Sequence, residues 1–210
     1  MKKFVSGRLF IAILMLSTFF IGILVCFLFY NNLHKVIVIN DNLEYDNTLF
    51  LPVNESIYCD QIGKAFGKTD SDNLQIFSIV GQDNSKFLCL IKNGKEYIYQ
   101  SQKQVPLTFP LFKSNKLNIQ SYMNDDKANN IIINDKNVLK NIQDDMSDKN
   151  IIDMPSEVSM VKQLIFSSAY YPGINIMLQY EHDTQGNCYI TNTTTNTTWK
   201  IGDELMKYVM

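Results

Sequence analysis

An uncharged apolar segment near the N-terminus constrains this chain more than any other feature. Residues Leu9 to Tyr30 read LFIAILMLSTFFIGILVCFLFY, without a single charge. A helix of this length spans the roughly 30 Å hydrocarbon core of a bilayer. A cleavable signal peptide has a shorter apolar core followed by small residues. A lipoprotein signal does not fit either, because Val25 precedes Cys26. The sequence therefore predicts an uncleaved transmembrane anchor over residues 9–30.

The charges that flank this segment predict its orientation. Lys2, Lys3 and Arg8 precede it, and the first 30 residues contain no acidic side chain. Positively charged flanks stay on the cytoplasmic side. We expect a single-pass protein of the cell membrane, with residues 1–8 in the cytoplasm and the C-terminal region outside the cell.

The outer region has an acidic balance that argues against nucleic-acid binding. The chain has 19 basic residues, of which three precede the apolar segment, so 16 lysines face 21 acidic residues for a formal charge of −5. Nucleic-acid binding depends on clustered basic side chains. Arg8 is the only arginine, so the outer region also lacks bidentate guanidinium clamps for phosphate or carboxylate. We expect no nucleic-acid partner.

Three cysteines follow the apolar segment, namely Cys59, Cys89 and Cys188. With an odd number, at most one internal disulfide can form. Cys59 with Cys89 is the possible disulfide that we single out. The alternative is that each is a small buried hydrophobic residue in reduced form. The sequence leaves the redox state of all three open.

The clearest local signals are two hairpins. KFLCLIKNGKEYIYQ (86–100) joins two runs of aromatic and β-branched residues through Asn93-Gly94, which favours a two-residue turn. A second hairpin is expected from 174–182 and 187–195, around a turn at 183–186, and the threonine-rich 192–198 is interpreted as a hairpin end. Further strands are predicted at 36–40, 48–53, 75–80, 130–134, 161–168 and around Trp199. Helices are predicted at 135–146, with Asp135 as N-cap, and in the last residues.

Sequential hairpins predict an α+β fold, made mainly of antiparallel β hairpins with a few short helices, preceded by one transmembrane helix. Pro106 and Pro110 interrupt a stretch without periodic pattern. We therefore divide the outer region into a β-rich subdomain at 36–104 and a second α+β subdomain at 105–210. Whether the two pack as one unit is left open.

The stretch IYCDQIGKAFGKTD (57–70) carries the residue types of a phosphate-binding loop: Gly63, Gly67, Lys68 and Thr69. A Walker A loop needs a glycine five positions before Gly67, and that position is Ile62. We expect a glycine-bearing bend between strands here, and no bound nucleotide.

Two other patterns point weakly to catalysis or metal binding. Ser159 to Lys162 forms an S-x-x-K tetrapeptide, but no K-T-G follows and Lys162 begins a predicted strand. His182 lies between Glu181 and Asp183, which as strand neighbours point to different sides and converge poorly on one ion. The acidic pairs at 70–72 and 144–145 lack the spacing of a calcium loop. We predict no catalytic residue, no metal ligand and no cofactor, and hence a protein that is not an enzyme.

Residues 57 to 100 resemble a small β-rich extracytoplasmic module of secreted and membrane-anchored proteins from low-GC Gram-positive bacteria. The matching features are an I-G-K…G-K-T segment (62–69), I-x-S-I-x-G (76–81), D-x-S-K-F (83–87) and N-G-K-E-Y (93–97). The resemblance covers about a fifth of the chain. It implies a β-rich module outside the cytoplasm, with no catalytic residues to transfer.

Two hypotheses of different class follow. The leading one is a membrane-anchored, non-enzymatic module that binds an envelope or membrane protein, as an accessory or regulatory subunit. Tyrosine and tryptophan are enriched at interfaces, and the contact candidates are Tyr97, Tyr99, Tyr170, Tyr171, Tyr180, Tyr189 and Trp199. The alternative is a small-ligand sensor or solute-binding domain, which predicts a concave pocket lined by aromatic side chains.

Overall fold

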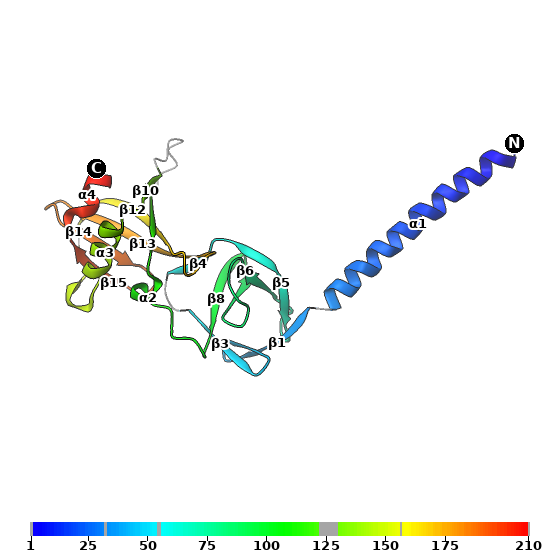
Figure 1. Cartoon of the computed structure of the whole chain (residues 1–210), viewed down its shortest axis with the longest axis horizontal. Coiled ribbons are helices and arrows are strands. Elements are labelled where there is room, and N and C mark those ends of the chain that lie inside the picture. The colour runs from blue at the N-terminus through cyan, green and yellow to red at the C-terminus, as the bar shows by residue number, and fades with distance from the viewer. Residues whose placement is uncertain (1, 32, 54–55, 122–129, 156, 210) are drawn as a thin grey trace.

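The protein consists of a long N-terminal helix followed by two β-sheets. The computed structural model describes residues 2–31, 33–53, 56–121, 130–155 and 157–209 (Figure 1). The first sheet closes into a barrel, and the second is an open sheet covered by short helices.

Helix α1 (Lys2–Asn31) extends away from the two sheets, as Figure 1 shows. Apolar side chains are exposed along it from Ile11 to Val25. Ser17 and Thr18 interrupt the apolar sequence, and their hydroxyls donate to the carbonyls of the preceding turn. Among the described residues, no helix combines the length and the apolar character that a membrane crossing requires. This finding overturns the transmembrane helix that the sequence predicted over residues 9–30.

The barrel is built from seven strands in the order β1-β2-β3-β8-β7-β6-β5, closed by parallel pairing of β1 with β5. Its strands are β1 (His34–Ile39), β2 (Asn42–Tyr45), β3 (Thr48–Pro52), β5 (Ile62–Thr69), β6 (Gln75–Ile79), β7 (Phe87–Lys92) and β8 (Lys95–Ser101). The predicted Asn93-Gly94 turn is confirmed. Both residues have positive φ, and Lys92 pairs with Lys95 across it.

The barrel interior is filled by side chains, and its buried members are Val36, Leu43, Phe50, Ile76, Leu88, Leu90 and Tyr99. Strand β7 is buried on both faces. Leu88 and Leu90 point into the barrel, whereas Phe87 and Cys89 belong to the core shared with the second sheet. This double burial explains why β7 reads as a continuous apolar run rather than an alternating one.

The second sheet has the order β10-β9-β12-β13-β14-β15-β11, and β4 adds to β13 off this path. Its strands are β4 (Ile57–Cys59), β9 (Lys116–Ser121), β10 (Ile131–Ile133), β11 (Ile151–Ile152), β12 (Val158–Ser167), β13 (Ile174–Asp183), β14 (Cys188–Asn192) and β15 (Thr197–Ile201). β4 and β14 share one edge of β13. β4 pairs with Ile174–Ile176 and β14 with Gln179–His182. A segment from before the barrel strand β5 thus joins the second sheet.

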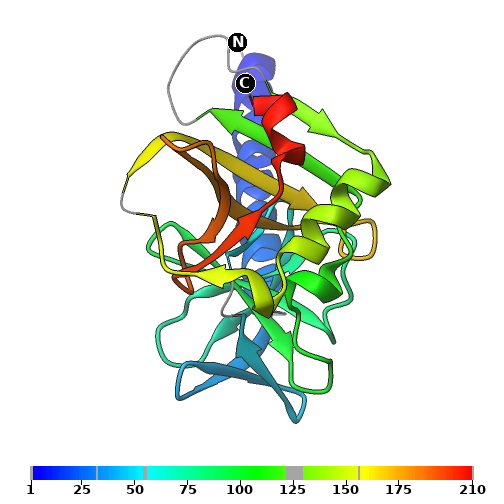
Figure 2. The same ribbon diagram turned by 90° about the vertical axis from the view of Figure 1, so that its left-hand side faces the viewer.

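Short helices cover the apolar face of the second sheet, as the turned view in Figure 2 shows for the green and red segments. They are α2 (Phe109–Phe112), η1 (Asp148–Asn150), α3 (Lys136–Asp145), η2 (Asp203–Leu205) and α4 (Met206–Val209). The prediction for α3 is confirmed, including its N-cap. Asp135 Oδ1 accepts hydrogen bonds from the backbone N–H groups of Asn137 and Val138. Val138, Leu139 and Ile142 are the buried residues of this helix.

The two sheets are joined by one continuous core. Its members come from the outer wall of the barrel (Ile79, Phe87, Cys89, Ile98), from β4 (Cys59) and from the second sheet and its helices. Two glycine turns meet at the same junction, Gly81 after β6 and Gly173 before β13, both with positive φ. Gln82 Nε2 donates to the carbonyl of Pro172 over 2.7 Å, which ties the turns together.

The α+β class that the sequence predicted is wrong, because the described residues form a mostly β fold with a closed barrel. The strands β2, β4, β5, β9 and β11 were not predicted. Several of them are only two to four residues long, and such strands gain their stability from cross-strand pairing rather than from local propensity. The bend predicted at residues 62–69 is also wrong, because these residues form strand β5.

Candidate binding groove between the two sheets

A groove of about 990 Å³ lies where the barrel meets the second sheet. Its walls come from the start of β8, from the end of β3 and from β4, β13 and the turn between β14 and β15. The lining residues are Pro52, Val53, Ser56, Ile57, Tyr58, Gly94, Lys95, Glu96, Tyr97, Ile98, Met177, Thr193 and Thr194. Segments distant in the sequence therefore combine to form this surface.

The wall next to β13 is fixed by a small polar network. Ser56 Oγ donates to Asn192 Oδ1 over 2.6 Å and lies 2.9 Å from Thr194 Oγ1. Asn192 is buried, and its Oδ1 also accepts from the backbone N–H of Thr194. The backbone N–H of Met177 donates to the Ser56 carbonyl over 2.7 Å. These bonds hold the β14–β15 turn against β4 and so define one side of the groove.

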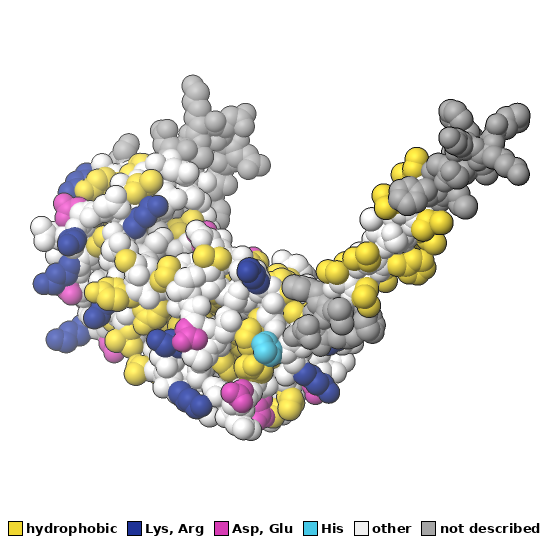
Figure 3. All heavy atoms as spheres, turned by 45° about the vertical axis from the view of Figure 1, so that its right-hand side comes forward, with side chains coloured by type: hydrophobic (Ala, Val, Ile, Leu, Met, Phe, Trp, Pro, Cys, Tyr) yellow, Lys and Arg dark blue, Asp and Glu magenta, His cyan; other side chains and the backbone are white. Residues whose placement is uncertain are grey.

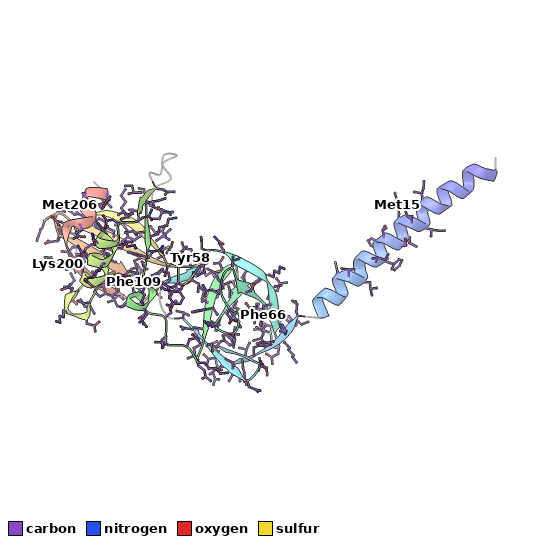
Figure 4. The ribbon with its side chains drawn as sticks, in the orientation of Figure 1. Met15, Tyr58, Phe66, Phe109, Lys200 and Met206 are labelled. Atoms are coloured by element: carbon purple, nitrogen blue, oxygen red, sulfur yellow. The ribbon has the colours of Figure 1, made fainter. Side chains whose placement is uncertain are left out.

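Aromatic and thioether side chains give the groove its apolar surface. Tyr97 and Met177 are 43% and 38% exposed, large fractions for such side chains. Tyr58, at the junction of the two sheets in Figure 4, accepts a long hydrogen bond from Asn175 Nδ2 at its hydroxyl. Burial raises the pKa of Tyr58, and the negative charges of Asp60 and Glu96 add to this shift. The phenol therefore remains a neutral hydrogen-bonding group at physiological pH.

The pairing between β3 and β8, as far as the described residues show it, ends within the groove. Strand β8 pairs with β3 only as far as Tyr99 with Pro52, and one more bond follows from the Val53 N–H to the Ile98 carbonyl. Within the described part of the chain, no strand continues this pairing along Lys95–Tyr97. Strand β4 lies close to β8 without pairing to it. Unpaired backbone groups on a strand edge can pair with an additional extended segment.

A second cavity of about 430 Å³ lies on the helix-covered side of the second sheet. Buried Ile176 and Leu178 form its floor, and Trp199 lines it. Its remaining walls are Thr108, Phe109, Pro110, Met146, Asp148, Ile151, Asn192, Thr195 and Thr197. An apolar floor with a few polar groups at the rim is typical of small-molecule sites.

The structure brings together the two cysteines that the sequence singled out. Cys59 on β4 and Cys89 on β7 are buried free thiols whose side chains are hydrogen-bonding partners. This contact lowers the pKa of Cys59, because the Cys89 thiol stabilises the Cys59 thiolate, and it raises the pKa of Cys89. Cys188 lies elsewhere, where it accepts a hydrogen bond from the Tyr180 hydroxyl. The disulfide itself stays a prediction.

The structure also brings Ser159 next to His182, with 3.2 Å between Oγ and Nδ1. The serine hydroxyl, however, is directed to backbone carbonyls, 2.9 Å from that of His182 and 3.4 Å from that of Asp183. Ser159 sits where the β12–β13 register shifts between Val158 and Met160, so its hydroxyl satisfies carbonyls at a bulge. Nε2 of His182 has no partner in the described structure, and so no third group orients the ring. Lys162 is not part of this contact, because its ammonium donates to Ser121 Oγ.

The residues of the apparent phosphate loop have structural roles in the barrel. A Cβ on Gly63 would meet Ser78 Oγ at 2.3 Å, and one on Gly67 would meet the His34 carbonyl oxygen at 2.5 Å. Both glycines thus allow close approach of neighbouring strands. The buried Thr69 hydroxyl accepts from the backbone N–H of Leu74 over 2.9 Å and closes the β5–β6 turn.

The acidic pairs are occupied in structural contacts as well. Asp70 Oδ1 accepts from the Val38 N–H, and Asp145 Oδ2 accepts from the Gly202 N–H over 2.8 Å. Among the described residues, no three His, Cys, Asp or Glu side chains form a cluster that could hold a metal ion.

Of the predicted contact aromatics, only Tyr97 lies in the groove, and Trp199 lines the second cavity. Tyr170 is 71% exposed and lines neither of them, Tyr171 stacks on Phe112, and Tyr99, Tyr180 and Tyr189 are buried. Tyr58, Met177 and the Ser56–Asn192 network were not predicted from the sequence. Only the pairing of β4 with β13 brings these residues together, and a three-residue strand gives no periodic signal that would have revealed it.

Comparison with known proteins found no matching family model, no curated relative and no similar solved structure.

Proposed function

We propose that this protein is a non-enzymatic binding module that takes up an extended segment of a partner protein in the groove between its two sheets. The observation that carries the proposal is a groove lined by Tyr58, Tyr97 and Met177 and bordered by Lys95–Tyr97 of β8, a stretch that no strand among the described residues pairs with on the β3 side. Main-chain pairing to a sheet edge supplies affinity, and pockets for alternate side chains supply specificity.

The chemistry of the lining defines the partner segment. Tyrosine and methionine favour an apolar or aromatic anchor side chain. Lys95 and Glu96 at the same edge favour neighbours of mixed charge. The Ser56 and Thr194 hydroxyls, which already bind Asn192 and each other, can only accept further hydrogen bonds from the segment. We therefore expect a short extended peptide with one large apolar residue, presented by an envelope or membrane protein for which this chain is an accessory or regulatory subunit.

A photo-crosslinking amino acid tests the proposal in the intact cell. Placed at position 97 in the full-length, C-terminally tagged chain, it should capture one partner in stoichiometric amounts. The matched control places it at Tyr170, which is more exposed but outside the groove. Equal capture from both positions, or none from position 97, would contradict the proposal.

We also propose that the protein resides at the cell membrane, with its two sheets outside the cytoplasm. Apolar side chains are exposed along α1 from Ile11 to Val25 (Figure 3). A contiguous exposed apolar surface marks an interaction site, which supports retention of the protein at a membrane or on a membrane protein. Added protease should digest the sheets in intact cells, and deletion of residues 2–31 should release the protein from the membrane fraction.

The second cavity favours one alternative function, a small-ligand sensor. Trp199 lines it and is the only tryptophan of the chain, so its fluorescence reports occupancy directly. A ligand at 100 times its dissociation constant adds about 2.7 kcal/mol to the free energy of unfolding. A compound screen that finds both a fluorescence change and this stabilisation, both lost in the cavity-filling variant Leu178→Phe, would favour the sensor over the peptide-binding module.

A further inference from the structure

We infer that Cys59 and Cys89 form a disulfide that ties the second sheet to the barrel wall. The two thiols lie on strands of different sheets, β4 and β7, and belong to the one core that joins those sheets. The inference is independent of what the groove binds.

The two thiols lie close to each other and apart from the third cysteine of the sheets. Both side chains are buried, at 4% and 0% exposure, and each is the other's hydrogen-bonding partner. Cys188 lies on β14 and is engaged by Tyr180 at 3.2 Å. Of the three cysteines in the sheets, the folded chain therefore brings only this pair into contact.

The pair also lies where the two sheets share their core. β4 is only three residues long, and it pairs with β13 through Ile57, Tyr58 and Cys59. It also carries one wall of the groove. A covalent link from Cys59 to β7 would fix this short strand to the barrel at the point where the two sheets meet.

The chemistry is thiol–disulfide exchange with a small disulfide or the disulfide of an oxidoreductase. The Cys59 thiolate attacks one sulfur of the oxidant, a mixed disulfide forms, and the first thiol leaves. The Cys89 thiolate then attacks Cys59 Sγ and releases the second thiol. Both cysteine sulfurs are oxidised, the oxidant disulfide is reduced, and the two cysteine protons end on the two released thiols. The lowered pKa of Cys59 suits it to the first step.

The test refolds the full chain from its reduced state in a glutathione redox buffer. Cys26→Ala removes the exposed thiol on α1 and leaves three cysteines. Acid quenching, denaturation and a polyethylene-glycol maleimide then count the free thiols by gel shift. We expect three labels before oxidation and one after it, with Cys59 and Cys89 linked in the non-reduced peptide map. Three labels after refolding, or a link that involves Cys188, would overturn the inference.

Two controls test whether the lost labels come from a disulfide between Cys59 and Cys89. In Cys59→Ala and Cys89→Ala, oxidation should leave both remaining thiols free. In the chain with the pair intact, oxidation should raise the thermal midpoint by roughly 5–10 °C, because the closed loop of residues 59–89 restricts the unfolded chain. The thiol count of the chain that keeps both Cys59 and Cys89 tests the disulfide by itself, whether or not either alanine variant folds.

Discussion

Gly173 lies so close to Val80 that no side chain fits between them: a Cβ on Gly173 would stand 2.5 Å from the carbonyl oxygen of Val80. This contact joins the turn before β13 to the turn after β6, and thus the second sheet to the barrel. Beside it, the Asp60 N–H donates to the Gly173 carbonyl over 2.9 Å. The junction is built from backbone contacts that require a residue without a side chain.

Gly173→Ala should therefore lower the free energy of unfolding by roughly 2–4 kcal/mol. About 1–2 kcal/mol comes from the positive φ of the site, and the remainder from the clash with Val80. Gly94→Ala is the matched control, because Gly94 has nearly the same φ but nothing within 4 Å of its would-be Cβ. Urea unfolding of both variants measures the difference. Equal losses would show that the junction tolerates a methyl group.

Local sequence patterns correctly predicted the elements that depend only on residues close together in the chain. The Asn93-Gly94 turn, the Asp135 cap and the hairpin at Asp183–Gly186 all lie where they were expected. The barrel was not predicted, because its closure depends on the parallel pairing of β1 with β5. The sequence predicted a bend at Gly63 and Gly67. In the structure both glycines lie in strand β5, where the neighbouring strands β6 and β1 approach too closely for a side chain. The groove was missed for a related reason, since β4 gains its place from β13 rather than from its own sequence.

Glu181 gives the chain a pH-dependent stability. Its side chain is 1% exposed on the face of β13 opposite Tyr180, and neither carboxylate oxygen has a hydrogen-bond partner in the described structure. Burial raises its pKa above the ordinary 4.5. The Thr191 hydroxyl opposes this shift, although it does not reach hydrogen-bonding geometry with either oxygen.

The folded state therefore holds a proton at Glu181 that the unfolded chain releases more easily. This stabilisation is complete below pH 4.5 and is lost as the pH rises through the raised pKa of Glu181. Glu181→Gln keeps the shape without titrating. We expect it to be more stable than wild type at neutral pH and less dependent on pH between 5 and 8. Parallel unfolding curves for the two proteins over this range would contradict the assignment.

Gln100 holds the segment between the sheets in place. Its Nε2 donates to the Val105 carbonyl over 2.7 Å, and its Oε1 accepts from the Leu107 N–H over 2.8 Å. Gln100→Ala leaves both backbone groups without these partners and should cost about 2–3 kcal/mol. Gln102→Ala, at an exposed position nearby, should change stability by less than about 0.5 kcal/mol. Chemical denaturation compares the two, and hydrogen exchange at Leu107 should accelerate only in the first variant.

Asp183 organises the hairpin between β13 and β14 as an acceptor of four hydrogen bonds. Oδ1 accepts from the backbone N–H groups of Gln185 and Asn187, and Oδ2 accepts from Asn187 Nδ2 and the Tyr189 hydroxyl. These bonds, with Asn187 contributing most, hold the pKa of Asp183 well below its ordinary value of 3.8. The stabilisation is thus present above pH 3.8 and is lost as the pH falls toward the lowered pKa.

Asp183→Asn replaces one of these acceptor oxygens with a donor that faces other donors, so the variant should be clearly less stable at pH 7. The gap between wild type and variant should narrow as the pH falls below 3.8, because the unfolded wild-type chain then gains a proton at Asp183 that the folded carboxylate does not yet take up. Asp72→Asn, at an exposed position in the turn between β5 and β6, serves as the control and should leave stability unchanged at both pH values. Guanidinium titrations at pH 7 and pH 3 measure the gap. A gap of constant size would mean that Asp183 acts through its shape in the turn rather than through its charge.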